Sequence, residues 1–558
     1  MRRVAVLMTM LLLCATTARA ATVQIVNADG SNEGFNDTTP VSPVGGNPGT
    51  TLGDQRLNVF QHAADIWGAI LPSNVTIRVR SRFDPLTCDA TSAVLGSAGP
   101  VSVFRNFPGA PLANTWYHGA LGDRLADTDL DPGGNDITAR FNSDIDNNDA
   151  CLQGRSWYYG FDGNEGVDVE LLPVVLHELG HGLGFSSLVN LSTGTEFMGA
   201  PDLYERFIRD NSLGTTWDNL SDAERVTSAV NDGNVVWDGR NAQIAASGIL
   251  GPQPVMDIDS PAPITGTIPV GTAGFGPSVP DTGITGNLVL VDDGDGVTTD
   301  ACAPLINASA VSGNIALIDR GGCTFASKTL EAQAAGAIAV VIINNVAGNT
   351  PIGLGGSEPS ATIPTVSITM ADGDSIKAHL GSGVNVTLTY DDAMLAGTDA
   401  TQRVKLYAPI TLASGSSISH WDVSATPSLL MEPSLTSTLS DDVDLTLYHF
   451  EDLGWLDLAT DSAALPRVTW LAPNAPNPFN PSTRIGFTLG IGRVVRLEIY
   501  DVAGRLVRQL VNESLPAGDH ATLWNGRDDH QQDVASGVYY YRLVGDGVDA
   551  RRSMVLLR

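Results

Sequence analysis

Two histidines and a glutamate stand at a spacing that suits metal-dependent hydrolysis. His177 and His181 are four positions apart, and Glu178 directly follows the first of them. Side chains at positions i and i+4 of an α-helix project from one face, so both imidazoles could bind a single zinc ion. Glu178 would lie beside the ion without serving as a ligand, where its carboxylate could accept a proton from zinc-activated water. A helix with two incidental surface histidines is the ordinary alternative, but this arrangement is rare by chance in a chain with nine histidines.

A catalytic zinc ion usually has three protein ligands and a fourth position for water, so a third ligand is needed. Ser187 stands where the extended form of the motif would have a histidine or an aspartate. Two other residues could supply the ligand. Asp202 lies 21 residues after His181, and His420 lies far downstream, with Met431 eleven residues beyond it.

A helix must hold this motif, and the periodicity predicts one over about residues 170–183. Pro173 is tolerated in the first turn of a helix, and Gly184 is available to end it. An apolar stripe at helical spacing would keep the helix in a core. It consists of Leu172, Leu176, Leu179 and Leu183.

The remaining elements follow from periodicity and composition. A helix is predicted from about residue 51, with an apolar face made of Leu57, Phe60, Ala64 and Trp67. Between 263 and 395, the order strand (315–318), helix (327–335), strand (337–343) indicates a small independent α/β or β-rich module. A Pro/Asn-rich linker over 463–478 precedes alternating strands over 479–558, which suggest a β-sandwich.

The histidine motif, the later Ser419-His420-Trp421 sequence and Met431 together resemble the leishmanolysin type of metzincin, in which an insertion displaces the third histidine. The segment 451–455 resembles the sequence after the methionine turn in such proteins. By this resemblance His420 is preferred over Asp202 as the third zinc ligand, and Met431 lies beneath the metal as a structural floor. A partly buried histidine and a core methionine are the ordinary interpretations of these two residues.

The insertion over 263–395 resembles the protease-associated domain of secreted and vacuolar peptidases. Cys302, the run 315–325 and residues 335–337 carry the similarity. Such modules are non-catalytic lids or substrate-positioning elements, and this one would lie beside the cleft. The tail resembles the immunoglobulin-like C-terminal units of exported bacterial proteins, which implies export machinery or the cell surface as a partner. Residues 477–483, 500–505 and 537–541 carry that similarity.

The first twenty residues have the parts of a signal peptide, with Arg2 and Arg3, an apolar run over 4–15 and a small-residue cleavage site before Ala21. No later apolar run is long enough for a transmembrane helix. Four cysteines remain in the mature chain, and an exported protein would use them as disulfides. The economical pairing is Cys88 with Cys151 and Cys302 with Cys323. A four-cysteine zinc site is the competing interpretation, although no Cys-x-x-Cys pair exists.

The formal net charge of −31 argues against nucleic acid or an anionic membrane as a partner. Carboxylates are bunched as calcium ligands would be, at Asp127, Asp129 and Asp131 and again at Asp144, Asp146 and Asp149. A solvated acidic turn is the favoured alternative to calcium at these two places.

We therefore expect a multidomain α+β protein. Its parts are a signal peptide (1–20), a metzincin-like catalytic domain in two pieces (21–262 and 396–462), an inserted protease-associated domain (263–395), a linker (463–478) and a C-terminal β-sandwich (479–558). The expected function is that of a secreted zinc endopeptidase acting on proteins or peptides, with Glu178 as the general base. A surface-displayed binding protein with a vestigial zinc site is the alternative, and a non-proteolytic zinc hydrolase is a third one.

Overall fold

The computed structural model describes residues 20–456 except 91, 357 and 435–441. It also describes residues 470–556 except 472–473, 475–478, 480, 490–492, 502–504, 516–517, 531 and 546–547. The chain forms two compact units, Met1–Trp455 and Leu456–Arg558. The predicted signal peptide lies outside the described residues except for Ala20, and so does the predicted linker except for residues 470, 471 and 474.

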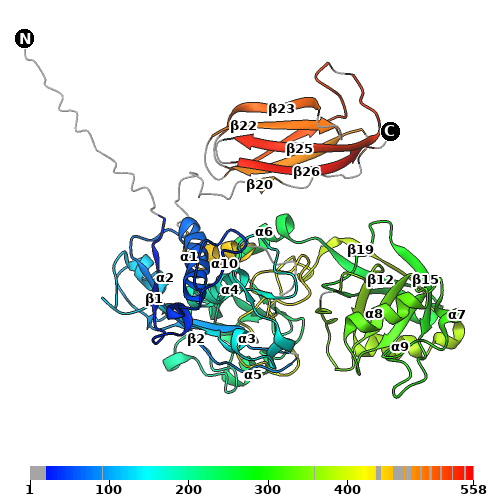
Figure 1. Ribbon diagram of the computed structural model, residues 1–558, viewed down its shortest axis with the longest axis horizontal. Coiled ribbons are helices and arrows are strands. Elements are labelled where there is room, and N and C mark those ends of the chain that lie inside the picture. Colours follow the sequence, from blue (N-terminus) through cyan, green and yellow to red (C-terminus); the bar gives the residue numbers. More distant parts are fainter. Residues whose placement is uncertain are drawn as a thin grey trace, which may run out of the picture. The chain divides into compact units, whose positions relative to one another are not determined.

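The first unit contains a main body, which we define as residues 20–251 and 396–455. Its central sheet has the strand order β1 (Val23–Asn27), β2 (Ile77–Asp84), β6 (Ile137–Asn142), β3 (Gly96–Pro100). The first three strands are parallel, and the terminal strand β3 is antiparallel to β6. Two helices pack together against this sheet, α1 (Leu52–Ile70) on β1 and α4 (Leu171–Leu183) on β3 and β6 (Figure 1).

The predicted apolar face of the first helix is wrong at one position. Leu57 is 40% exposed, whereas Phe60 and Trp67 are fully buried. The buried face of α1 includes Arg56, whose guanidinium forms ion pairs with Asp37 at 3.3 Å and with Asp146 at 2.7 Å. A buried charge is tolerated when it is paired, so the face turns toward Arg56 and leaves Leu57 at the surface.

Shorter elements complete the main body. They are β4 (Val103–Phe104), β5 (Tyr117–His118), α2 (Gly119–Ala126), α3 (Asp144–Asn147), β7 (Trp157–Tyr158), β8 (Val169–Glu170), β9 (Ile208–Asp210), β10 (Thr215–Thr216), α5 (Asp222–Ser228), β11 (Val235–Trp237), α6 (Arg240–Ile249) and α10 (Thr446–Asp452). A disulfide joins Cys88 to Cys151. Within the described part of the chain, no helix has both the length and the apolar character needed to cross a membrane.

An inserted module, residues 252–395, interrupts the main body. Its eight-stranded sheet has the order β13-β12-β19-β15-β16-β17-β18-β14, with β15 to β18 parallel. The elements are β12 (Pro252–Ser260), β13 (Gly266–Pro269), β14 (Gly271–Thr272), β15 (Ile284–Leu290), α7 (Ala308–Val311), β16 (Ile315–Asp319), α8 (Phe325–Ala334), β17 (Ala339–Ile343), β18 (Thr365–Ile368), α9 (Met370–Lys377) and β19 (Asn385–Leu395).

The inserted module has its own core. Every residue of β17 is buried, as expected for a parallel strand with both faces covered. A second disulfide joins Cys302 to Cys323. The first strand, β12, begins at Pro252 and pairs antiparallel with β19. The module's sheet therefore includes residues before 263, where the sequence pattern alone placed its start.

The second unit is a β-sandwich, as predicted. One sheet has the order β20 (Trp470–Leu471), β21 (Thr483–Leu489), β24 (Gly518–Trp524), and the other β23 (Leu506–Leu515), β22 (Arg493–Asp501), β25 (Gly537–Gly545), β26 (Val548–Leu556). Phe487 of the first sheet and Leu497 and Tyr541 of the second belong to one buried apolar cluster. The two sheets therefore pack face to face.

Candidate metal centre

Three imidazoles converge at one point of the main body. His177 and His181 project from α4, and His420 comes from the irregular segment after the inserted module. The Nε2 atom of His177 lies 3.1 Å from those of His181 and His420, and the latter two are 3.2 Å apart. Within the described residues, this trio is the only group of three or more potential ligand side chains close enough to share an ion.

The other nitrogen of each ring fixes its tautomer. Each Nδ1 lies within hydrogen-bond distance of a backbone carbonyl oxygen, which can only accept, so each Nδ1 must carry the proton. The acceptors of His177, His181 and His420 are the carbonyls of Leu430 at 2.7 Å, Phe185 at 2.8 Å and Ser416 at 2.8 Å. All three Nε2 atoms therefore present lone pairs to one another, and a cation between them removes the repulsion.

The donor set fits zinc. Zn²⁺ binds imidazole nitrogen at about 2.0–2.1 Å in a tetrahedral arrangement, which places the nitrogens about 3.3–3.4 Å apart. Burial lowers the pKa of His177 to about 4 and that of His181 to about 3, and it lowers the pKa of His420 well below its usual value. The rings are therefore neutral at physiological pH, as metal binding requires.

Glu178 lies beside the histidines and is 7% exposed. The backbone N–H of Ala98, on the terminal strand β3, donates to its carboxylate. A Cβ atom at Gly96 would lie 3.0 Å from Cγ of Glu178, so the glycine leaves room for this side chain. Burial raises the pKa of Glu178 to about 8, and a cation held by the histidines would lower it by stabilising the carboxylate.

Close packing holds α4 in place. A Cβ at Gly180 would come within 2.7 Å of Sδ of Met431, and one at Gly182 within 2.4 Å of Cγ2 of Ile137. Met431 is fully buried under the helix, and its carbonyl accepts a hydrogen bond of 2.8 Å from the Trp421 N–H, next to His420. The four leucines of the predicted stripe are all buried. The helix ends at Gly184, which has φ 134°, a value that suits glycine.

Asp202, the alternative third ligand, lies outside the histidine trio. It is 2% exposed, and its Oδ2 accepts from Ser187 Oγ at 2.9 Å and from Leu188 N at 2.5 Å, while Oδ1 accepts from Glu205 N at 2.7 Å. The Asp202 carboxylate therefore stabilises the loop that follows α4. Ser187, at the position where a third ligand was sought, serves as its donor.

Some residues that support the centre were missed by the sequence analysis. The N–H of Leu430 donates to Asp444, and that of Leu429 donates to Glu432 Oε1 at 2.8 Å, so two carboxylates hold the backbone next to Met431. The residue types carried no motif, so spacing could not have found them.

Some of the acidic residues considered for calcium take part in other contacts in the structure. Asp146 forms the buried ion pair with Arg56 and accepts from Trp157 N at 3.0 Å. Asp129 accepts from Asp131 N at 3.0 Å, as in a turn. Neither group brings three ligand atoms together among the described residues.

Comparisons with known proteins identify both accessory domains. Residues 284–376 match the family model of the PA domain, and residues 487–547 match that of the FlgD Ig-like domain. Both resemblances proposed for these parts of the chain are thereby confirmed. The family of the main body is not covered by either match, so its resemblance to metzincins stays a prediction.

Individual relatives match limited parts of the chain. A receptor homology region, transmembrane domain- and RING domain-containing protein of Arabidopsis thaliana is 34% identical over 113 residues, which cover 20% of this chain and 24% of that protein. A zinc aminopeptidase from Bacillus subtilis is 25% identical over 27% of this chain and 35% of its own, with a TM-score of 0.19. FlgD from Xanthomonas campestris is 23% identical over 16% of this chain and 67% of its own, with a TM-score of 0.13. The chain thus spans about a quarter of the plant protein and about a third of the aminopeptidase. It is a multidomain protein with a PA domain and a C-terminal immunoglobulin-like domain.

Proposed function

We propose that this protein is an exported zinc endopeptidase of the metzincin type, with its centre at His177, His181, His420 and Glu178. The observation that carries the proposal is the convergence of three proton-free Nε2 atoms beside a buried carboxylate. Three neutral nitrogen ligands with an adjacent acid are the donor set of hydrolytic zinc sites.

The roles of the residues follow from their positions. His177, His181 and His420 would hold the zinc ion, which when bound acts as a Lewis acid toward water and the scissile carbonyl. Glu178 accepts the proton of the attacking water at its carboxylate and passes it to the leaving amine nitrogen. The hydrogen bond from the Ala98 N–H holds this carboxylate next to β3. The carbonyls of Leu430, Phe185 and Ser416 orient the three rings.

The terminal strand β3 supports a peptide as the substrate. Among the described residues β6 is the one strand that pairs with it, and it lies directly against α4. An extended peptide can add to such an edge through backbone hydrogen bonds. That mode of binding holds residues on both sides of the scissile bond, which favours an endopeptidase over an enzyme that removes terminal residues.

Zinc content and proteolysis of casein test the proposal together. The unmodified chain is expected to bind one zinc ion and to digest casein. Glu178→Gln should keep the zinc and lose digestion by a factor of about 10² or more, since the general base is removed. His420→Ala should lose the zinc, whereas Asp202→Ala and the matched control His379→Ala should keep it. Retained digestion in Glu178→Gln would falsify the assignment of the base, and a zinc-free unmodified chain would favour a binding protein.

A further inference from the structure

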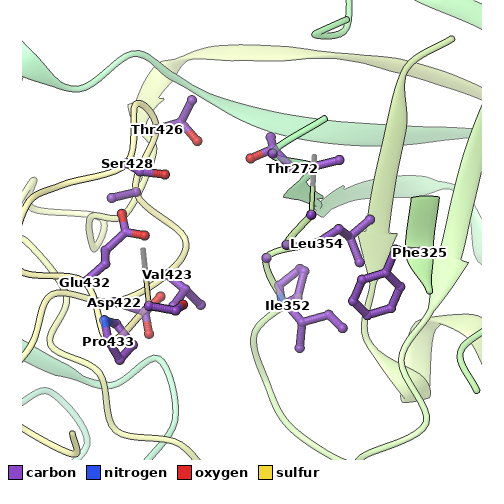
Figure 2. Close-up of a pocket in the computed structure, with 18 of the residues that line it drawn as sticks. Thr272, Phe325, Ile352, Leu354, Asp422, Val423, Thr426, Ser428, Glu432 and Pro433 are labelled. Carbon is purple, nitrogen blue, oxygen red and sulfur yellow. The ribbon is translucent and has the colours of Figure 1, made fainter. Parts of the chain in front are cut away.

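A cavity of about 1110 Å³ lies between the main body and the inserted module. Figure 2 shows its two facing walls. The main body contributes Asp422, Val423, Thr426, Ser428 and Glu432, and the module contributes Thr272, Phe325, Ile352 and Leu354. Contacts between the two parts close one border, where Asp232 of the main body accepts from the Thr350 N–H at 2.9 Å and from the Thr350 hydroxyl at 2.6 Å.

The wall from the main body carries two buried carboxylates. Asp422 and Glu432 are 2% and 4% exposed. One carboxylate oxygen of Asp422 accepts a hydrogen bond from Ser424 N at 3.0 Å. One carboxylate oxygen of Glu432 accepts a hydrogen bond from Leu429 N at 2.8 Å. In the described part of the chain, neither carboxylate forms a direct ion pair, although the nearby charge of Lys405 acts to lower the pKa of Asp422 against the effect of burial. This wall is therefore suited to a cationic side chain, which would gain a charge-assisted hydrogen bond there.

The opposite wall and the border of the cavity also carry apolar side chains. Phe325, Ile352 and Leu354 line the side formed by the inserted module. Large apolar side chains that are exposed to solvent border the same cavity from both parts of the unit. They are Val167 at 73%, Val346 at 48% and Ile410 at 42%. A group of exposed apolar side chains around a cavity indicates a surface that a partner covers.

The size and charge of the cavity restrict the occupant. Pockets for small ligands usually measure about 300–1,000 Å³, so this one has room for a segment of a polymer. The cavity lining also contains Arg155 and Arg320, but its acidic residues outnumber them, with Glu165, Asp168, Glu170 and Asp232 in addition to the two buried carboxylates. The whole chain has a formal net charge of −31. A second copy of this acidic chain would be repelled, whereas a peptide with basic residues would be attracted.

We propose that this cavity binds an extended stretch of a polypeptide substrate in which apolar side chains alternate with lysine or arginine. The proposal rests on the proposed peptidase function and names the substrate class of that site. The cavity adjoins the metal centre, because Ser416 lines it and the Ser416 carbonyl holds the ring of His420. A substrate that continues beyond the centre can therefore contact both parts, and long chains should be bound more tightly than short ones.

Binding to the zinc-loaded Glu178→Gln protein provides the test, measured by fluorescence anisotropy of labelled peptides. One peptide is short, a second extends it with alternating leucine and lysine, and a third extends it with alternating leucine and glutamate. The leucine–lysine extension is expected to lower Kd about tenfold, an effect comparable to burying most of one apolar side chain. The leucine–glutamate extension should give no such gain.

Variants of exposed residues locate the effect. Val346→Ser and Ile410→Ser should abolish the gain from the leucine–lysine extension. Ile306→Ser is the matched control, since Ile306 is 69% exposed in the same module but does not line the cavity, and it should retain the gain. Equal affinity for all three peptides, or a gain that survives in both serine variants, would overturn the proposal. A dimer of the unmodified chain that Val346→Ser dissociates would also overturn it, because a second copy would then be the occupant.

The measurement separates this proposal from the proposed function. Binding is recorded on a protein without its general base, so the absence of casein digestion by the unmodified chain would refute the peptidase and leave the binding data intact. If the unmodified chain digests casein but peptide binding does not depend on the length or charge of the peptide, only the proposed role of the cavity is refuted.

Discussion

The imidazole of His449 is fully buried, and neither of its ring nitrogens has a hydrogen-bond partner among the described residues. It stacks on Phe185 with ring centroids 4.2 Å apart and lies 4.1 Å from the ring of Trp237. Burial lowers its pKa well below the usual value. The folded chain therefore takes up no proton on this ring, whereas the unfolded chain takes one up below about pH 6.5.

His449→Phe should stabilise the first unit. The phenyl ring keeps the aromatic packing and removes two buried polar atoms, so the free energy of unfolding should rise by about 1–3 kcal/mol. The gain should grow as the pH falls below about 6.5, because only the histidine binds a proton on unfolding. Thermal unfolding at pH 5 and pH 8 measures both effects. A lower melting temperature in the variant would mean that the nitrogens have a partner, such as a buried water.

Two carboxyl groups share a site near the end of α2. Asp123 and Asp136 are 3% and 8% exposed, and burial together with the neighbouring carboxyl raises the pKa of Asp123 to about 7. A carboxyl group whose pKa is higher in the folded state favours folding at low pH, and this stability is lost as the pH rises from about 4 to about 7.

Asp123→Asn should remove that pH dependence. The amide can donate to Asp136 and still accept from the Leu130 N–H, which lies 2.8 Å from Oδ1. We expect a melting temperature about 1–2 °C above that of the unmodified chain at pH 8, because about 1 kcal/mol shifts the melting temperature of a large unit less than that of a small domain. The difference should vanish at pH 4. An equal increase in melting temperature at pH 8 and at pH 4 would show that Asp123 and Asp136 share no proton.

Single residues also mark the limit of prediction from sequence. His177, Glu178 and His181 could be selected because their types and spacing fit one face of a helix. The groups that orient the rings are backbone carbonyls, and a carbonyl has the same chemistry at every residue. Asp202 shows the opposite problem, a residue that the sequence suggests for a site it does not join. Its spacing from His181 suited a zinc ligand, but its Oδ2 accepts hydrogen bonds from the loop after α4.

At the scale of the element, the position of α4 depends on its glycines. A Cβ at Gly182 would collide with three side-chain carbons of Ile137, which is fully buried on β6. Gly182→Ala should therefore push the helix from the sheet, destabilise the protein by about 1–3 kcal/mol and weaken zinc binding through the adjacent His181. Thermal unfolding and zinc titration measure the two effects.

A glycine in another helix provides the control for that prediction. A Cβ at Gly248, within α6, would meet no atom within 4 Å. Gly248→Ala should stabilise the protein by about 0.5–1 kcal/mol and leave zinc binding unchanged. If both variants behave alike, close packing at Gly182 is not what positions the helix.

The elements themselves were largely predictable where the pattern was long. The helix expected over residues 170–183 spans Leu171–Leu183, because its apolar spacing and Gly184 act together. The face of α1 was predicted wrongly at Leu57, since the pattern could not reveal that Arg56 is paired inside the fold. The strand β12 was not anticipated as part of the inserted module, because its partner β19 lies more than a hundred residues away in sequence.

At the scale of the whole molecule, the two units should be separable. The division falls between Trp455 and Leu456, and each unit has its own buried core. A chain that ends at residue 455 is expected to bind one zinc ion and to digest casein within about twofold of the full chain, since a domain with its own core folds alone. Metal analysis and a casein assay decide this. Loss of zinc in the shortened chain would show that the second unit is required for the first to fold.

The insertion of a complete module between the proposed zinc ligands also determines when the centre can form. His181 and His420 are separated by 239 residues, most of them in or around the module. A ribosome adds about 5–20 residues per second, so about 10–50 s pass between the synthesis of the second ligand and the third. Throughout that interval the growing chain has a helix with two ligands and no complete centre. Any hydrolytic activity of this protein is thus delayed during synthesis by the order of its ligands along the chain.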